Sequence, residues 1–461
     1  MSKANSKRDE QHQLTRRALI KWSVAAGAAL GVSRSRIFDI LEGTAGTGIA
    51  HAAAEHATTR SVHIVAGNGG HAWFQLLWPQ VDVAKAGNPN FAWHRPGMAV
   101  DVPGTARPLV RGPDTPWETM PAQRQITAFT CGANETHTTQ PQSVVGLNGN
   151  NIFSVASALQ AGAPSVIPIV AIGDVDVGTA PGGARPANVG NGEGIVGLFN
   201  SAASRAGGLL ERTSDAQLYK AHYDAFSQLN RAANRSTTKA SYTTASGAAA
   251  FLGTNLAAKL SITAEDLQRY GVDGNMRANV EDIARTFIVT VKAFKMGLTN
   301  SVVMPALRDD PHTAFADGSV DIVPAQLRRV FDAFMADLTA TTDDATLKSL
   351  ADDTVITICG DTTKNPLDRS GWPDNSPGNT NVIYVYSAGH LKSGWFGSVD
   401  RNGTAMGFDG QGQPAAYDGG ATAKYATASI AYAIAKRDER AIAQFANGTT
   451  ISGTFGKPKD Q

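Results

Sequence analysis

The chain has 461 residues, of which 42% are hydrophobic and 18% are charged, and its formal net charge is +1 at pH 7. This composition is typical of a soluble globular protein with enough chain for a large core, built as one large α/β domain or two smaller ones. A nearly neutral charge gives no support for a nucleic-acid partner, which calls for a basic face.

Residues 1–54 are interpreted as an export signal. The segment 15–21, TRRALIK, combines paired arginines with apolar residues and a lysine, and it resembles a twin-arginine signal. The apolar stretch 22–32 is too short to span a bilayer, so we expect no transmembrane segment in the mature chain. The resemblance implies the twin-arginine translocase as the partner during export, and a periplasmic or extracellular location. An uncleaved N-terminal anchor is the alternative.

The first strand of the mature chain is predicted over residues 61–67, SVHIVAG, and it leads into the Gly-rich turn 68–71. Glycines in such a turn let the backbone approach a ligand closely. The tryptophan-rich segment 73–121 is predicted to be irregular. Its aromatic side chains either wall a cleft or pin a long loop to the core.

A helix over residues 150–160 and a buried strand over residues 165–172 are predicted next. The tetrad 173–176, GDVD, follows that strand and offers oxygen ligands for a hard cation, although such residues also solvate ordinary turns. The Gly- and Asn-rich residues 178–194 are predicted to form a long loop.

Residues 213–298 are predicted to form a helical insertion. Three helices are expected in it, beginning at Ser214 or Asp215, near Thr263, and at Asn279 or Glu281.

The helical insertion is followed by a strand over residues 301–305. A helix that leads into a strand is the repeating unit of a parallel sheet. Pro324 is predicted to open an amphipathic helix over residues 325–338. Buried strands are then predicted over residues 354–358 and 382–386.

The loop between the last two strands carries three candidate site residues, Asp361, Lys364 and Asp374. Open α/β sheets place their ligand chemistry in loops at the C-terminal ends of parallel strands, which favours a functional role here. An ordinary acidic surface loop has the same composition and remains the alternative.

A second candidate cluster, Asp310-Pro311-His312, follows the strand at 301–305. Carboxylate oxygen and imidazole nitrogen suit zinc, manganese or iron. Asp and His are also common in loops that have no ligand. The two cysteines, Cys131 and Cys359, form no metal-binding spacing, and we favour buried thiols over one disulfide.

Several motifs within residues 285–400 resemble an uncharacterised family of twin-arginine-exported bacterial proteins in the alkaline phosphatase and sulfatase superfamily. Asp310-Pro311-His312 stands at that family's tryptophan-aspartate-threonine-histidine motif. Residues 360–365, GDTTKN, stand at its serine-glutamate-phenylalanine-glycine-arginine-threonine motif. Asp374-Asn375 stands at its aspartate-histidine pair, and residues 388–397 resemble its glycine-rich ending.

The resemblance implies one α/β domain over residues 55–461, with a mostly parallel sheet flanked by helices as in alkaline phosphatase. It also implies a metal-assisted hydrolase that acts on a phosphate or sulfate ester of a small molecule or polymer. The implied ligands of a divalent metal (Zn, Mn or Ca) are Asp310, His312, Asp361 and Asp374. Lys364 is then expected to neutralise the substrate anion.

Two departures from the family pattern support a different function. Asn375 replaces a histidine, and His71 follows the Gly-Gly turn where the family has an aspartate. Because asparagine binds such metals poorly, the alternative is a superfamily member that has lost its chemistry. It would then serve as a periplasmic or cell-envelope binding or assembly protein.

Overall fold

The computed structural model describes residues 58–86, 91, 97–163, 165–199, 255–344, 346–361 and 363–456. The expected export signal, the expected helix from Ser214 or Asp215 and Trp93 lie outside the described residues.

An eight-stranded sheet forms the centre of the fold, with strand order β10-β4-β9-β8-β1-β7-β5-β6. The strands are β1 Arg60–Gly67, β4 Thr127–Cys131, β5 Ile169–Ile172, β6 Ala187–Val189, β7 Ser301–Arg308, β8 Thr354–Gly360, β9 Asn381–Tyr386 and β10 Gly394–Phe396. Within this sheet, β9 runs antiparallel to its neighbours β8 and β4, and the other pairings are parallel. The prediction of a mostly parallel α/β sheet is therefore confirmed.

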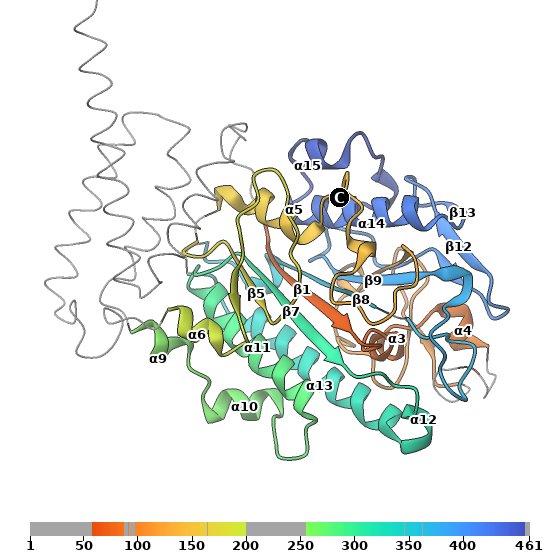
Figure 1. Ribbon diagram of the computed structural model, residues 1–461, viewed down its shortest axis with the longest axis horizontal. Helices are drawn as coiled ribbons and strands as arrows, with labels where there is room; N and C mark the ends of the chain where they lie inside the picture. Colours follow the sequence, from red (N-terminus) through yellow and green to blue (C-terminus); the bar gives the residue numbers. More distant parts are fainter. Residues whose placement is uncertain are drawn as a thin grey trace, which may run out of the picture.

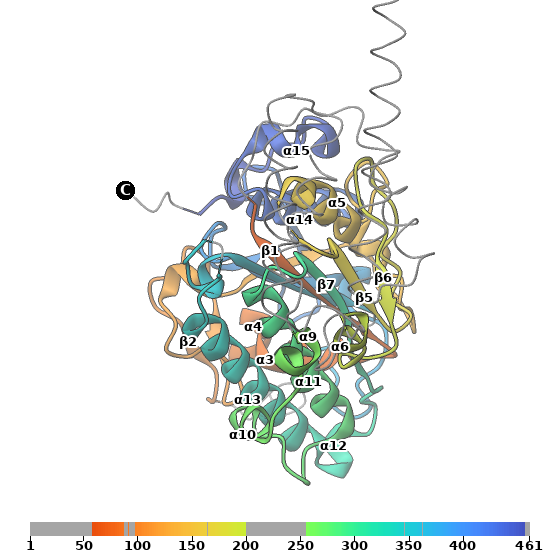
Figure 2. The ribbon, with the colours of Figure 1, turned by 90° about the vertical axis from the view of Figure 1, so that its left-hand side faces the viewer.

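Helices cover both faces of this sheet (Figure 1). One face carries α3 Ala72–Leu77, α10 Ala264–Tyr270, α11 Ala278–Lys295 and α13 Ser319–Ala340, and the other carries α5 Ile152–Leu159, α14 Gly419–Ile434 and α15 Glu439–Ala446. Figure 2 shows the same two layers from the side. Strands covered on both faces need continuous apolar runs, and β1 is buried along its whole length.

Shorter elements complete the described chain. The helices are α4 Val81–Lys85, α6 Gly194–Leu198, α9 Leu256–Leu260 and α12 Ala314–Asp317, with 3-10 turns at Ala122–Arg124, Gln142–Val144, Gln160–Gly162, Leu350–Asp352, Pro377–Asn379 and Ser452–Thr454. A hairpin pairs β2 Val100–Asp101 with β3 Val110–Arg111, and a small sheet joins β11 Ser398–Val399, β12 Ala405–Phe408 and β13 Pro414–Ala416. No helix in the described part of the chain is long and apolar enough to cross a membrane.

Several predicted elements are confirmed close to their expected positions. They are the strands β1, β7, β8 and β9 and the helices α5, α10 and α11. Thr263 caps α10 through a capping box with Asp266, which is the start signal expected near that residue.

The strand predicted over residues 165–172 is wrong in its first half, because β5 begins at Ile169. Pro168 has no backbone N–H for a sheet ladder, and its carbonyl accepts a hydrogen bond from Ser301 N at 3.1 Å. The N–H groups of Val166 and Ile167 both donate to Leu298 O instead. The apolar composition of this segment therefore reflects burial before the strand begins.

The loop predicted over residues 178–194 contains a short edge strand, β6, that pairs in parallel with β5. A strand of three residues is too short to show an alternating pattern in the sequence. The residues around it are irregular, as expected.

Helix α13 begins at Ser319, earlier than the predicted start at Pro324. Gly318 precedes it with φ +78°, a backbone conformation that glycine adopts readily. Pro324 lies in the second turn of the helix, where its missing N–H removes one backbone hydrogen bond. The predicted apolar stripe of α13 is buried, as expected: Leu327, Val330, Phe331, Phe334 and Leu338.

The tryptophans at 73, 78 and 117 pin the segment 73–121 to the core, because all three are buried. Trp78 and Trp117 pack together with ring centroids 5.4 Å apart. Trp73 Nε1 donates to Asp309 O at 3.0 Å, which ties the first helix to the loop after β7.

Cys131 and Cys359 are free, buried thiols, as favoured from the sequence. They lie on β4 and β8, which are separated by β9. Two inter-strand spacings amount to about 10 Å, beyond the roughly 7 Å limit between the Cα atoms of a disulfide.

The native protein is therefore expected to show no reaction with Ellman's reagent. Burial raises the pKa of both thiols, which adds to their lack of access. After unfolding in guanidinium without reductant, both cysteines should react. Reaction that requires a prior reduction step would contradict the assignment of free thiols.

Candidate cation site at the carboxyl edge of the sheet

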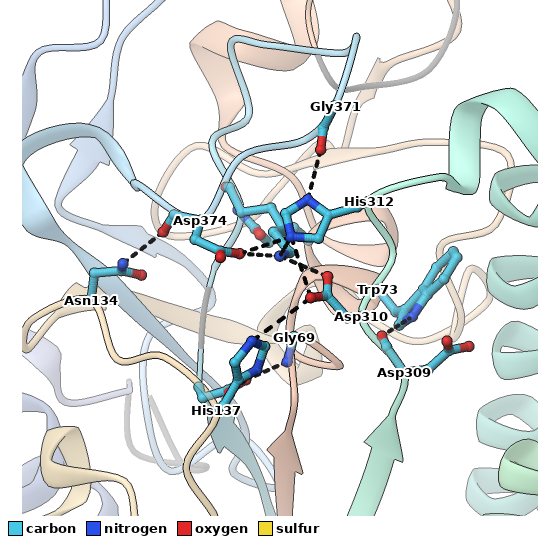
Figure 3. A network of polar contacts seen from close by, with 12 residues as sticks. Gly69, Trp73, Asn134, His137, Asp309, Asp310, His312, Gly371 and Asp374 are labelled. Atoms are coloured by element: carbon cyan, nitrogen blue, oxygen red, sulfur yellow. Dashed lines mark hydrogen bonds and ion pairs between the residues drawn. The ribbon is translucent and has the colours of Figure 1, made fainter.

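Loops that follow four strands of the sheet meet at one edge, where the parallel strands end (Figure 3). The strands are β1, β4, β7 and β8, and β1 lies between β7 and β8. Their loops bring together residues far apart in the sequence, from Gly69 to Asp374. This edge is where open α/β sheets place ligands.

Asp310, His312 and Asp374 point toward one another at this edge (Figure 3). One ligand atom from each residue lies within 4.8 Å of the others, so the group could hold a metal ion. His312 Nε2 lies 3.3 Å from Asp310 Oδ2 and 3.5 Å from Asp374 Oδ1. These are three of the four residues that the resemblance implied as metal ligands.

Two contacts to backbone carbonyl groups position His312 and the loop that carries Asp374. His312 Nδ1 lies 2.8 Å from Gly371 O, which orients the ring and leaves Nε2 facing the two carboxylates. Asn134 Nδ2 donates to Asp374 O at 2.6 Å, and this contact fixes the loop after β8 against the loop after β4.

Lys364 places its ammonium among the same three side chains. Nζ lies 3.0 Å from His312 Nε2 and 2.8 Å from Asp310 Oδ1, and it also pairs with Asp374 Oδ1. The lysine side chain is 0% exposed, whereas the carboxylates of Asp310 and Asp374 are 29% and 36% exposed. The cluster thus already contains a cation, supplied by the chain itself.

The lysine charge controls the ionisation of Asp374. Partial burial opposes ionisation of this carboxyl, but the hydrogen bond and positive charge of Lys364 outweigh it, so the pKa of Asp374 lies below its ordinary value. With His312 neutral, two carboxylates and one ammonium leave the cluster with a formal charge of −1.

Asp361 lies beside this cluster, and its carboxylate accepts hydrogen bonds from backbone N–H groups. Its Oδ1 accepts a hydrogen bond from Gly69 N at 2.7 Å, and its Oδ2 accepts one from Thr138 N at 3.1 Å. Burial raises the pKa of Asp361, although the two N–H donors act in the opposite direction. This carboxylate therefore joins the loops after β1 and β4 and is outside the group that could hold a metal.

The Gly69-Gly70 turn packs directly against the loop after β7. A Cβ atom on Gly69 would lie 3.1 Å from Asp310 Oδ1, and one on Gly70 would lie 1.9 Å from Leu307 O. Gly69 also has φ +79°. The close approach that the structure shows is to Asp310 and Leu307, and the expected approach of this turn to a ligand stays a prediction.

His137 belongs to the same edge and was missed from the sequence. Its Nε2 lies 3.9 Å from Asp310 Oδ2, and its Nδ1 lies 3.7 Å from Asp361 Oδ2. The available signal was the short apolar run TAFTC, which forms β4 and ends just before this loop. Recognition of that strand would have placed His137 at the same edge as the other candidates.

The tetrad 173–176 and His71 lie outside the group that could hold a metal in the described chain. Asp174 pairs with Arg308, and Asp176 Oδ1 accepts from Gly178 N at 2.8 Å. Neither aspartate belongs to the group that could hold a metal in the described chain. His71 is fully buried with its ring centroid 5.9 Å from that of Tyr384, and Asn375 is exposed next to Asp374.

The functional groups at this edge of the sheet include carboxylates, imidazoles and one ammonium. Between residues that the structure describes, the hydrogen bonds and ion pairs of Asp310, His312, Lys364 and Asp374 reach no hydroxyl or thiol group. The nearby thiol of Cys359 is buried and its pKa is raised, so it is a poor nucleophile.

The types of donor atom and their spacing suit an ion such as zinc, but the ammonium of Lys364 occupies the position between them. Metal–ligand bonds to such donors are about 2.0–2.2 Å long, and the ammonium of Lys364 lies within hydrogen-bond distance of all three residues. While Lys364 keeps this position, the residues present do not fit a metal ion.

Comparison with models of known protein families, with curated proteins and with solved structures found no match. The class of the protein therefore rests on its own fold and site: an α/β protein with a mostly parallel sheet and a carboxylate–histidine–lysine cluster at its carboxyl edge.

Replacement of Asp361 by asparagine is expected to lower the free energy of unfolding by about 1.5–3 kcal/mol, the usual range for hydrogen bonds to a charged group. The amide would keep one acceptor for Gly69 N but would place N–H groups against Thr138 N. Urea denaturation measures the change. Asp368→Asn is the matched control, because among the described residues the Asp368 side chain accepts hydrogen bonds only from Ser370, in an exposed turn, and its replacement should change stability little. Equal effects of the two substitutions would contradict the role given to Asp361.

Proposed function

We propose that this chain is an exported binding or assembly protein of the cell envelope, built on the scaffold of the alkaline phosphatase and sulfatase superfamily without its metal-dependent chemistry. The observation that carries this proposal is the position of the Lys364 ammonium, 3.0 Å from His312 Nε2 and 2.8 Å from Asp310 Oδ1. The motif resemblance and the twin-arginine-like segment support the scaffold and the export.

Metal-assisted ester hydrolysis needs a Lewis acid at the reacting oxygen and a nucleophile beside it. An ammonium held by two carboxylates and buried to 0% exposure cannot reach a substrate phosphate or sulfate. The cluster also has a formal charge of −1, which repels an anionic ester. Asn375 points in the same direction, because asparagine binds such metals poorly, and His71, which stands where the family has an aspartate, is fully buried.

The proposal is tested on the exported protein, purified without chelators or added metal. Elemental analysis should find no stoichiometric zinc, manganese or calcium. Phosphate monoesters, phosphate diesters and sulfate esters, each assayed with and without these three ions, should be hydrolysed no faster than by the Asp310→Ala variant. One equivalent of metal per chain, together with hydrolysis that Asp310→Ala abolishes, would overturn the proposal.

The second candidate function is the metal-assisted hydrolase of phosphate or sulfate esters. It is favoured by the convergence of Asp310, His312 and Asp374 within 4.8 Å. This function requires the ammonium of Lys364 to leave the cluster and the ion to enter. Titration of the wild-type protein with zinc, manganese and calcium, followed by calorimetry, decides between the two: saturable binding of one ion at micromolar concentration favours the hydrolase.

A further inference from the structure

We infer that Lys364 is a chain-borne substitute for a metal ion, and that removal of its ammonium converts Asp310, His312 and Asp374 into a binding site for one divalent cation. This inference rests on the proposed function, because it takes the wild-type site to be free of metal. It adds a latent site that becomes accessible through a single substitution.

Two of the three distances between donor atoms match the spacing of a coordination shell, and all three donors lie within 4.8 Å of one another. For ligands about 2.0–2.1 Å from a tetrahedral ion, neighbouring donor atoms are about 3.3 Å apart. Asp310 Oδ2 and Asp374 Oδ1 lie 3.3 Å and 3.5 Å from His312 Nε2. The hydrogen bond between His312 Nδ1 and Gly371 O at 2.8 Å keeps Nε2 directed at the carboxylates, as outer contacts do in metal sites.

The negative charge of the two carboxylates and the space left by the lysine side chain also favour binding of an ion after the ammonium is removed. Lys364→Ala would leave two carboxylates without their cation, and a divalent ion would bring their combined charge to zero. Because the lysine side chain is 0% exposed, its truncation opens a space beside all three donors. Entry from solvent is available, because Asp310, Asp374 and His312 are 29%, 36% and 44% exposed.

The other lysines that the structure describes pair with at most one carboxylate and with no histidine. Lys292 provides the matched control, because its Nζ lies 2.5 Å from Asp266 Oδ2 and 2.6 Å from Ser261 O. Among the described residues, its side chain pairs with one aspartate and with no histidine. Removal of the Lys292 ammonium therefore exposes a single carboxylate, which is too small a ligand set for a specific ion.

The experiment compares the full-length wild-type protein with Lys364→Ala, Lys364→Arg, Lys292→Ala and the double variant Lys364→Ala/His312→Ala. Calorimetric titration with zinc chloride should give one equivalent bound by Lys364→Ala, at least 100-fold more tightly than by any other protein in the set. Cobalt should give the visible absorption of tetrahedral coordination with Lys364→Ala. Zinc should raise the melting temperature of that variant and leave that of Lys364→Arg unchanged.

The outcomes separate this inference from the proposed function. If wild type binds no metal and folded Lys364→Ala binds none either, the inference is wrong and the proposed function stands. If wild type already holds one equivalent of metal, both fail. Should Lys364→Ala be unfolded as purified, refolding from guanidinium with and without zinc decides: recovery only with zinc supports the inference, and failure in both conditions overturns it.

Discussion

Replacement of Asp343 by alanine is expected to lower the free energy of unfolding by about 3–5 kcal/mol, because it leaves a buried guanidinium without its counter-ion. Arg60 and Asp343 form an ion pair with side chains only 10% and 1% exposed. Arg60 NH1 also donates to Thr299 O at 3.0 Å, and the guanidinium lies 5.5 Å from the ring centroid of Phe294. This pair fixes the start of the central strand β1. Urea denaturation monitored by tryptophan fluorescence measures the loss.

A matched exposed pair provides the control for Asp343. Lys85 and Asp101 approach to 2.5 Å, but their side chains are 43% and 68% exposed. Asp101→Ala should therefore cost no more than about 1 kcal/mol, as is usual for surface ion pairs. The double variant Arg60→Met/Asp343→Leu should be more stable than Asp343→Ala, because it removes both charges together. A double variant that is less stable than Asp343→Ala would contradict the account.

Acidification from pH 7 to pH 4 is expected to destabilise the fold by about 3 kcal/mol for each of two buried histidines. Burial lowers the pKa of His63 and His71 to about 3. The pKa in the unfolded chain is about 6.5, so between these values the unfolded state binds more protons. The free energy of unfolding therefore falls as the pH falls from about 6.5 towards 3.

Carboxyls whose pKa is raised by burial, such as Glu135 and Asp361, act in the opposite direction over part of this range. Burial raises the pKa of Glu135 to about 7, so its contribution to stability grows as the pH falls from 7 towards its unfolded value. Glu135 is only partly buried, so its effect is smaller than that of two fully buried histidines.

The acid prediction is tested by urea denaturation at several pH values between 7 and 4. The variant His63→Gln, whose amide can keep the hydrogen bond to Thr357 Oγ1, should show a flatter dependence on pH. His137→Gln is the control, because the side chain of His137 is 47% exposed. The same pH dependence in wild type and His63→Gln would show that His63 is not the source of the acid sensitivity.

The sequence predicted the central strands well because they are buried on both faces. β1, β7 and β8 are rich in apolar and β-branched residues and are buried along most of their length, and such segments are visible without knowledge of the fold. The start of β5 was misplaced because the apolar residues before Pro168 are buried outside the sheet. β6 was missed because three residues carry no pattern.

The sequence predicted several residues of the candidate site, but it did not predict how these residues are arranged relative to one another. Asp310, His312 and Asp374 follow buried strands, and that position singled them out. The order of the strands in the sheet determines which loops meet, and the sequence does not show that order. In the structure β1 lies between β7 and β8, and His137 from the loop after β4 lies at the same edge. Lys364 is buried between two carboxylates only because these loops meet. The sequence around Lys364 does not show this, so it predicted a lysine that neutralises a bound anion.

The most direct test of the account is X-ray diffraction from crystals of the wild-type protein grown with zinc or manganese, with data collected at the absorption edge of each metal. We expect no anomalous peak at the cluster, and we expect the Lys364 ammonium to contact Asp310, His312 and Asp374. An anomalous peak coordinated by those three residues, with Lys364 turned away, would contradict it.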